Sequence, residues 1–127
     1  HAGCLEALAS GTAIARDAAA AGVPPGPGRS APDAADVFAA ARAGNAPAQR
    51  IVAHTARRLG LGLASAVNAF DPAIVVLGGG VMAAWDDLQA VVMATVAAHA
   101  MSDAWREGGV VVGTLGDDAG LVGAAEM

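Results

Sequence analysis

The sequence predicts a helix-rich α/β fold that contains about two strands of a mostly parallel sheet. The first observation is a continuous apolar, β-branched run, Ala73–Leu77, between Pro72 and Gly78, a pattern typical of a strand buried on both faces. The second is the shorter run Val110–Val112. Between and before these runs, apolar residues recur at helical spacing. Two strands cannot form an independent, doubly covered sheet, so we expect the chain to be a fragment of a larger domain.

The helices are predicted from apolar periodicity together with start and stop signals. Asp33 and Asn45 are good N-cap residues, and Gly22 and the Asp71-Pro72 pair are stop signals. A stretch rich in proline and glycine, residues 23–32, should be a loop. The predicted helices run from Leu5 to about Ala21, from Ala34 to Ala43, from Asn45 to the Asp71-Pro72 stop, from Trp85 to Val96, and from Asp118 to Glu126.

Two glycines lie inside the longest predicted helix. Gly60 and Gly62 each cost up to about 1 kcal/mol relative to alanine in a helix interior. We therefore expect another element to approach this helix closely at these positions.

Composition limits the classes of function. The 127 residues are 55% hydrophobic and carry a net charge of −5, and the seven basic residues are scattered arginines, which argues against a nucleic-acid surface on this segment. The apolar run Ala73–Leu77 is too short to cross a bilayer, so the chain is expected to be soluble and cytoplasmic, with no membrane partner. A single cysteine, Cys4, cannot form an internal disulfide.

The strongest local signal for chemistry is the segment Gly78-Gly79-Gly80-Val81, which follows a predicted strand and precedes a helix. Glycines at this edge of a parallel sheet let the backbone lie against a phosphorylated or flat ligand. The alternative is a tight turn that requires positive φ. The same residues also fit a dinucleotide fingerprint, because Gly78, Gly80 and Ala83 have G-x-G-x-x-A spacing. Against it, the next strand ends in Gly113-Thr114, with no acidic residue there to hold a ribose.

A weaker signal lies at the start of the chain, where Cys4 and Glu6 flank the beginning of a helix. A thiolate is favoured at such a place. A lone cysteine is more often a small buried hydrophobe, however, and a first-turn glutamate more often complements the helix dipole.

Three blocks of the sequence, in order and spacing, resemble the ROK (repressor, open reading frame, kinase) family. The similarity covers essentially the whole chain. The blocks are Gly3-Cys4-Leu5-Glu6 with Ala9-Ser10-Gly11-Thr12-Ala13, Asp71-Pro72 through Leu77-Gly78-Gly79-Gly80-Val81, and Leu115-Gly116-Asp117-Asp118 through Ala125.

The resemblance implies that residues 1–127 are the C-terminal segment of an actin-like ATPase (ribonuclease H-like) domain whose N-terminal lobe is absent. It implies an ATP- and Mg²⁺-dependent hexose kinase, similar to glucokinase, that works on a sugar substrate, commonly as a homo-oligomer. The family's aspartate base and phosphate loops have no counterpart here, so the segment alone should be catalytically incomplete. A sugar-sensing repressor, the one case with a nucleic-acid partner, is the alternative, and an NAD-binding oxidoreductase fragment ranks below both.

The resemblance also assigns roles to residues. Cys4 matches the last cysteine of a structural Zn²⁺ motif whose other ligands are missing from this chain, so no metal is expected in the segment by itself. Glu6 matches the glutamate that binds sugar hydroxyls. Gly78, Gly79 and Gly80, with Val81, match the loop on the adenosine side of ATP. Ser10 and Gly11 are expected to be packing residues.

Overall fold

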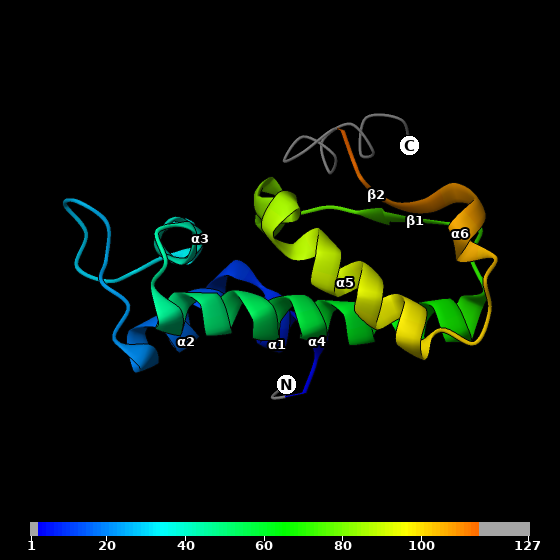
Figure 1. Ribbon diagram of the computed structural model, residues 1–127, viewed down its shortest axis with the longest axis horizontal. Coiled ribbons are helices and arrows are strands. Elements are labelled where there is room, and N and C mark those ends of the chain that lie inside the picture. Colours follow the sequence, from blue (N-terminus) through cyan, green and yellow to red (C-terminus); the bar gives the residue numbers. More distant parts are fainter. Residues whose placement is uncertain (1–2, 115–127) are drawn as a thin grey trace, which may run out of the picture.

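Helix α4 is the axis of the fold, and α1, α2, α3 and α5 all pack against it (Figure 1). The computed structural model describes residues 3–114. Within that range the elements are α1 (Leu5–Ala9), α2 (Gly11–Ala21), α3 (Ala34–Arg42), α4 (Ala46–Phe70), β1 (Ile74–Leu77), the 3-10 helix η1 (Gly80–Ala84), α5 (Trp85–His99), α6 (Trp105–Gly108) and β2 (Gly109–Val112).

The ends of α4 confirm the signals in the sequence. The Asn45 side chain accepts a hydrogen bond from the Ala48 N–H at 3.0 Å, and a proline in the first turn loses no helical hydrogen bond. At the other end Asp71 adopts a left-handed conformation with φ of 44°. With 25 residues, α4 is about 37 Å long, and one apolar stripe along its length is buried.

The single helix predicted over residues 5–21 is wrong, because the structure has two helices that meet at Ser10. Ser10 has an extended backbone, with φ of −84° and ψ of 166°, and its hydroxyl accepts a hydrogen bond from the Ala13 N–H at 3.2 Å. Ser10 therefore ends α1 and caps α2, a role that the prediction of a packing residue did not include.

The closest contact between helices joins α4 to α5 at Gly60. A Cβ atom placed on Gly60 would lie 2.6 Å from Cβ of Thr95 and 3.0 Å from the carbonyl oxygen of Val92. At Gly62 a Cβ atom would lie 2.8 Å from a terminal methyl of Leu5. Both glycines thus admit a neighbouring element, as the sequence predicts.

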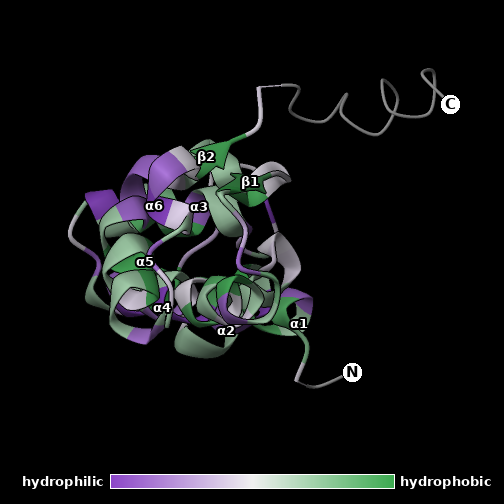
Figure 2. Cartoon of the chain, turned by 90° about the vertical axis from the view of Figure 1, so that its right-hand side faces the viewer, coloured by the Kyte–Doolittle hydropathy of each residue, from purple (hydrophilic) through white to green (hydrophobic). Residues whose placement is uncertain are grey.

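The two strands are parallel neighbours, paired from Ile74 with Gly109 to Leu77 with Val112. The prediction that β1 is buried on both faces is not met within residues 3–114, since Ile74 is 50% exposed and Val76 is 61% exposed. Helices cover one face of this sheet, and Figure 2 shows the apolar strands at the margin of the molecule. The other face has no cover from the described residues.

Helix α3 begins with a capping box. The Asp33 carboxylate accepts from the Asp36 N–H at 2.9 Å, and the Asp36 carboxylate accepts from the Asp33 N–H at 3.0 Å. The backbone N–H of Asp33, with that of Gly26, lowers the pKa of Asp36 below its ordinary value. The predicted loop before α3, residues 23–32, contains neither helix nor strand, and its Arg29 pairs with Asp33 and Asp36.

The segment Gly80–His99 is long and apolar enough to span a membrane by length and composition alone. In the fold it is a 3-10 turn followed by α5, and α5 buries Leu88, Val92 and Val96 within the protein core. The apolar character of α5 thus has a structural cause in its packing on α4.

We predict that Gly60→Ala in the full-length protein lowers the free energy of unfolding by about 1–2 kcal/mol, as measured by chemical denaturation. The added methyl group gains up to about 1 kcal/mol of helix propensity, but overpacking against Thr95 and the Val92 carbonyl costs about 1–3 kcal/mol. Unchanged or increased stability would contradict the close approach of α4 and α5.

The matched control is Gly62→Ala, on the same helix half a turn away. Its methyl group meets only the end of the Leu5 side chain, which is 41% exposed and can rotate away. We expect this variant to be at least as stable as the parent.

Candidate functional site

The glycine corner, Gly78–Gly80, lies exposed where β1 ends. Gly79 has φ of 97°, which only glycine adopts without strain. A Cβ atom on Gly78 or Gly80 would meet no atom of the described residues within 4 Å. The positive φ of the turn therefore explains the glycine at position 79. At Gly78 and Gly80 the absence of a side chain leaves the backbone exposed to open space.

A cleft of about 780 Å³ adjoins this corner. Its walls come from the first turns of α2, from α3 and from η1. Small and apolar side chains dominate the lining, a composition typical of a site for a small molecule or cofactor. The lining residues are Gly11, Thr12, Ala15, Asp33, Ala34, Ala35, Phe38, Arg42, Gly80, Val81, Ala83 and Ala84.

A second, smaller hollow of about 390 Å³ lies at the carboxyl ends of both strands. It is lined by the three glycines of the corner together with Met82, Ala83, Val112 and Gly113. Ligands of open α/β sheets bind at this edge. Gly80 and Ala83 line both hollows, so the glycine corner separates two adjacent spaces.

The two charged side chains in the wall of the larger cleft already have partners. Arg42 donates to Asp87 on α5, with Nε 3.0 Å from Oδ1, and this hydrogen bond raises the pKa of Arg42 above its ordinary value. Asp33 is held by Arg29 and the Asp36 N–H. The cleft therefore offers a largely apolar wall rather than a strong charge, which suits a flat, uncharged heterocycle.

Glu6 is exposed in the first turn of α1. This helix has only five residues, so its position depends on contacts with other elements. Leu5, the first residue of α1, packs into the space that Gly62 leaves on α4. At its other end, Arg58 donates to the Leu8 carbonyl at 3.3 Å and Arg16 donates to the Ala7 carbonyl at 3.3 Å.

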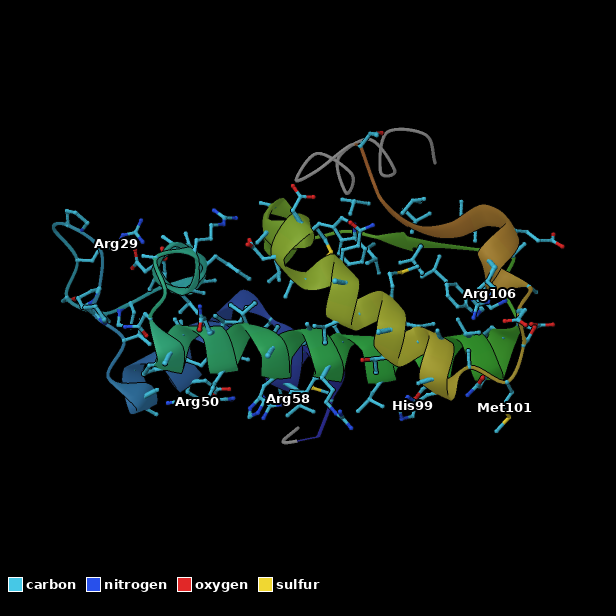
Figure 3. All side chains as sticks on the ribbon, in the orientation of Figure 1. Arg29, Arg50, Arg58, His99, Met101 and Arg106 are labelled. Atoms are coloured by element: carbon cyan, nitrogen blue, oxygen red, sulfur yellow. The ribbon has the colours of Figure 1, made fainter. Side chains whose placement is uncertain are left out.

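Asp17 joins the two arginines that hold α1. Its carboxylate lies 2.8 Å from Arg16 and 3.2 Å from Arg58. The hydrogen bond from Arg16, aided by the charges of both arginines and by the bond from Arg58, lowers the pKa of Asp17 below its ordinary value of 3.8. Figure 3 shows Arg58 on the lower side of α4.

The fold brings the start of α2 close to the glycine corner, whereas Glu6 itself lines neither hollow. Gly11, five residues after Glu6, lines the cleft together with Gly80 and Val81. A Cβ atom on Gly11 would lie 4.0 Å from a methyl group of Val81. Gly11 therefore belongs to the cleft wall, a role that the sequence analysis missed.

Cys4 is the N-cap residue of α1 and is exposed. Within residues 3–114 no group of three histidine, cysteine or acidic side chains could hold a metal ion. A tetrahedral Zn²⁺ site needs four ligands, so the role of Cys4 as a zinc ligand stays a prediction. The block from Leu115 to Ala125 and the helix predicted from Asp118 lie outside the described residues.

The wall that α3 contributes was not predicted. Asp33 was identified only as a helix cap, and Phe38 carries no functional signal in the sequence. No local motif marks them as site residues, because packing of α3 on α4 brings them beside η1.

A glycine corner at the carboxyl end of a parallel strand, beside an apolar cleft, lies at the edge where open α/β sheets bind their ligands. The chain belongs to the ROK family, whose family model matches residues 1–127. The resemblance in the sequence is thereby confirmed.

The chain is similar to several sugar kinases. It is 37% identical to a glucokinase from Halalkalibacterium halodurans over an alignment 129 positions long, which covers 95% of this chain and 39% of that protein. It also superimposes with a TM-score of 0.77 on a ROK family glucokinase from Streptomyces griseus in complex with glucose and AMPPNP. That match has 30% identity and covers 98% of this chain and 44% of the other.

A ROK family transcriptional regulator, described as a homologue of the MLC protein of E. coli, shares the fold as well. Its TM-score is 0.68 at 26% identity, over 87% of this chain and 29% of that one. The chain spans about two-fifths of the length of the glucokinases that it matches.

We predict that Asp17→Asn lowers the free energy of unfolding at neutral pH by up to about 1 kcal/mol, a typical value for a partly exposed ion pair. Because folding lowers the pKa of Asp17, its contribution is complete well above pH 3.8 and is lost as the pH falls below that value. Chemical denaturation of the parent and the variant should show a difference in the free energy of unfolding that is constant from pH 7 down to well above pH 3.8. The difference should become smaller as the pH falls below 3.8. A difference that is unchanged at pH 3 would exclude the ion pair as its cause.

Proposed function

We propose that this chain is the C-terminal part of an actin-like ATPase domain in a cytoplasmic hexose kinase that uses ATP and Mg²⁺. The observation that carries the proposal is the exposed glycine corner beside the 780 Å³ cleft. The similarity to a glucokinase that holds glucose and AMPPNP, an ATP analogue, supports it.

In this proposal the nucleoside of ATP occupies the cleft. Gly78, Gly79 and Gly80 let the main chain approach the nucleotide closely, and Val81 contributes apolar surface. The cleft volume falls in the range of small-molecule sites, about 300–1,000 Å³. Because Arg42 and Asp33 are paired with other side chains, the base lies in apolar surroundings. The cleft then offers no free positive charge to the phosphates, which we place outside it.

Glu6 binds the sugar in the same proposal. A carboxylate accepts hydrogen bonds from two neighbouring hydroxyl groups, and Glu6 is exposed on an element anchored by Arg58 and Gly62. Glu6 lies five residues before Gly11, which lines the cleft. This short separation along the chain suits a reaction between a sugar bound by Glu6 and a nucleotide in the cleft. Phosphoryl transfer also needs Mg²⁺ and an aspartate base, which we assign to the other lobe of the parent protein.

Exposed apolar residues support the expectation of a homo-oligomer in the parent. Phe70 is 82% exposed and Met101 is 92% exposed, and both lie away from the proposed site. Large apolar side chains exposed on a protein surface often mark a protein–protein interface where they gather in a patch.

We predict that Glu6→Gln in the full-length protein raises the KM for the sugar or lowers kcat/KM by about 10- to 100-fold. Hydrogen bonds to a charged group are worth about 1.5–3 kcal/mol. The affinity for AMPPNP, measured by calorimetry, should not change. The matched control is Glu107→Gln, since Glu107 is exposed on α6, which precedes β2 and so lies at the opposite end of the strands from the glycine corner. Equal effects of the two substitutions would exclude Glu6 from the sugar site.

We further predict that the full-length protein binds ATP and does not bind NAD, and that it transfers phosphate to glucose, an N-acetylated hexosamine or fructose. Calorimetric titration and a coupled kinase assay test this. NAD binding without ATP binding would overturn the proposed function.

The second candidate is a sugar-sensing repressor, which the similarity to the ROK transcriptional regulator favours. Sugar-dependent DNA binding by the full-length protein, without phosphoryl transfer, would decide for it.

A further inference from the structure

One ion pair crosses the rim of the large cleft. Arg42 lies at the end of α3, and Asp87 lies in the first turn of α5, 45 residues later. Nε of Arg42 is 3.0 Å from Oδ1 of Asp87, and Nη2 is 2.5 Å from Oδ2. Two parallel hydrogen bonds fix the orientation of both groups as well as their distance.

The pair joins the two opposite walls of the cleft. Arg42 itself lines the cleft on the α3 side. On the other side Ala83 and Ala84 of η1 line it, and η1 leads directly into α5, which carries Asp87. Figure 1 shows α3 end-on beside the first turns of α5, with both above α4.

Few other contacts join α3 directly to α5. Both helices pack along α4, and they share few direct contacts. Among the side-chain hydrogen bonds of residues 3–114, those of Arg42 with Asp87 are the ones that join α3 to α5. The spacing of the walls therefore depends on α4 below, on α2, whose Gly11 lies between Ala34 and Val81, and on this pair at the rim.

We propose that the Arg42–Asp87 pair is a brace that sets the width of the nucleotide cleft, so that Arg42 and Asp87 are positioning residues for ATP. This inference rests on the proposed function of the cleft. Both side chains act through the walls that they hold together, and neither needs to touch the nucleotide.

The expected size of the effect follows from the exposure of the pair. The Arg42 side chain is 60% exposed and that of Asp87 is 21% exposed. Such a pair adds little to global stability. Because the pair holds the walls at one width, we expect its loss to lower nucleotide affinity by about two- to fivefold.

The test is a double-mutant cycle in the full-length protein, with the Kd of AMPPNP measured by calorimetry. Arg42→Ala and Asp87→Ala should each raise the Kd by about two- to fivefold, and the double variant should raise it no further. The KM for the sugar should stay unchanged. High salt should weaken nucleotide binding less in the variants than in the parent, because it screens an exposed pair.

Two further variants serve as controls. Arg50→Ala removes the same charge from an exposed arginine on the lower side of α4 (Figure 3), away from the cleft lining, and should leave the Kd unchanged. Arg42→Lys keeps the charge and loses the two-point geometry, so its Kd should lie between those of the parent and Arg42→Ala.

Direct contact between Arg42 and the phosphates would give a different result. Arg42→Ala would then weaken binding, whereas Asp87→Ala would leave the Kd unchanged. The Kd of the double variant would therefore differ from that of Asp87→Ala. That outcome overturns the brace, as does an unchanged Kd in all three variants. If the parent protein itself binds no AMPPNP, the proposed function fails first, and the inference fails with it.

Discussion

The contact between α4 and α5 at Gly60 is the constraint on which the rest of the structure depends. Because Gly60 has no side chain, Thr95 and the backbone at Val92 can reach the surface of α4. This approach places α5 across the middle of the long helix (Figure 1). Since η1 and β1 precede α5 directly in the chain, the same contact determines where the glycine corner lies.

The candidate site is assembled from elements that have no sequence proximity. Helix α4 supports α1, α2 and α3, and the cleft forms between α2, α3 and η1. Charged groups around it are neutralised within the protein, as Arg42 by Asp87 and Asp33 by Arg29. A wall of small apolar side chains with balanced charges can hold an uncharged ring without a cost of desolvating ions.

The sheet has one face that the described residues leave uncovered. Ile74 and Val76 have the β-branched character of a buried strand, yet half or more of each is exposed in residues 3–114. Helices supply only one of the two layers that such a strand needs. The similarity to ROK proteins more than twice as long agrees with a covering layer formed elsewhere in the parent.

The sequence by itself determined the helix caps at Asp33 and Asn45, the end of α4 at Asp71, the two strands and the glycine corner, because each follows from local backbone chemistry. It also located the close approach to α4, since glycine inside a helix needs a reason. The break at Ser10 was missed because apolar spacing continues across it. Only tertiary structure decided that α3 and the first turn of α2 face η1, because residues 45 or more positions apart become neighbours through packing on α4 rather than through any local pattern.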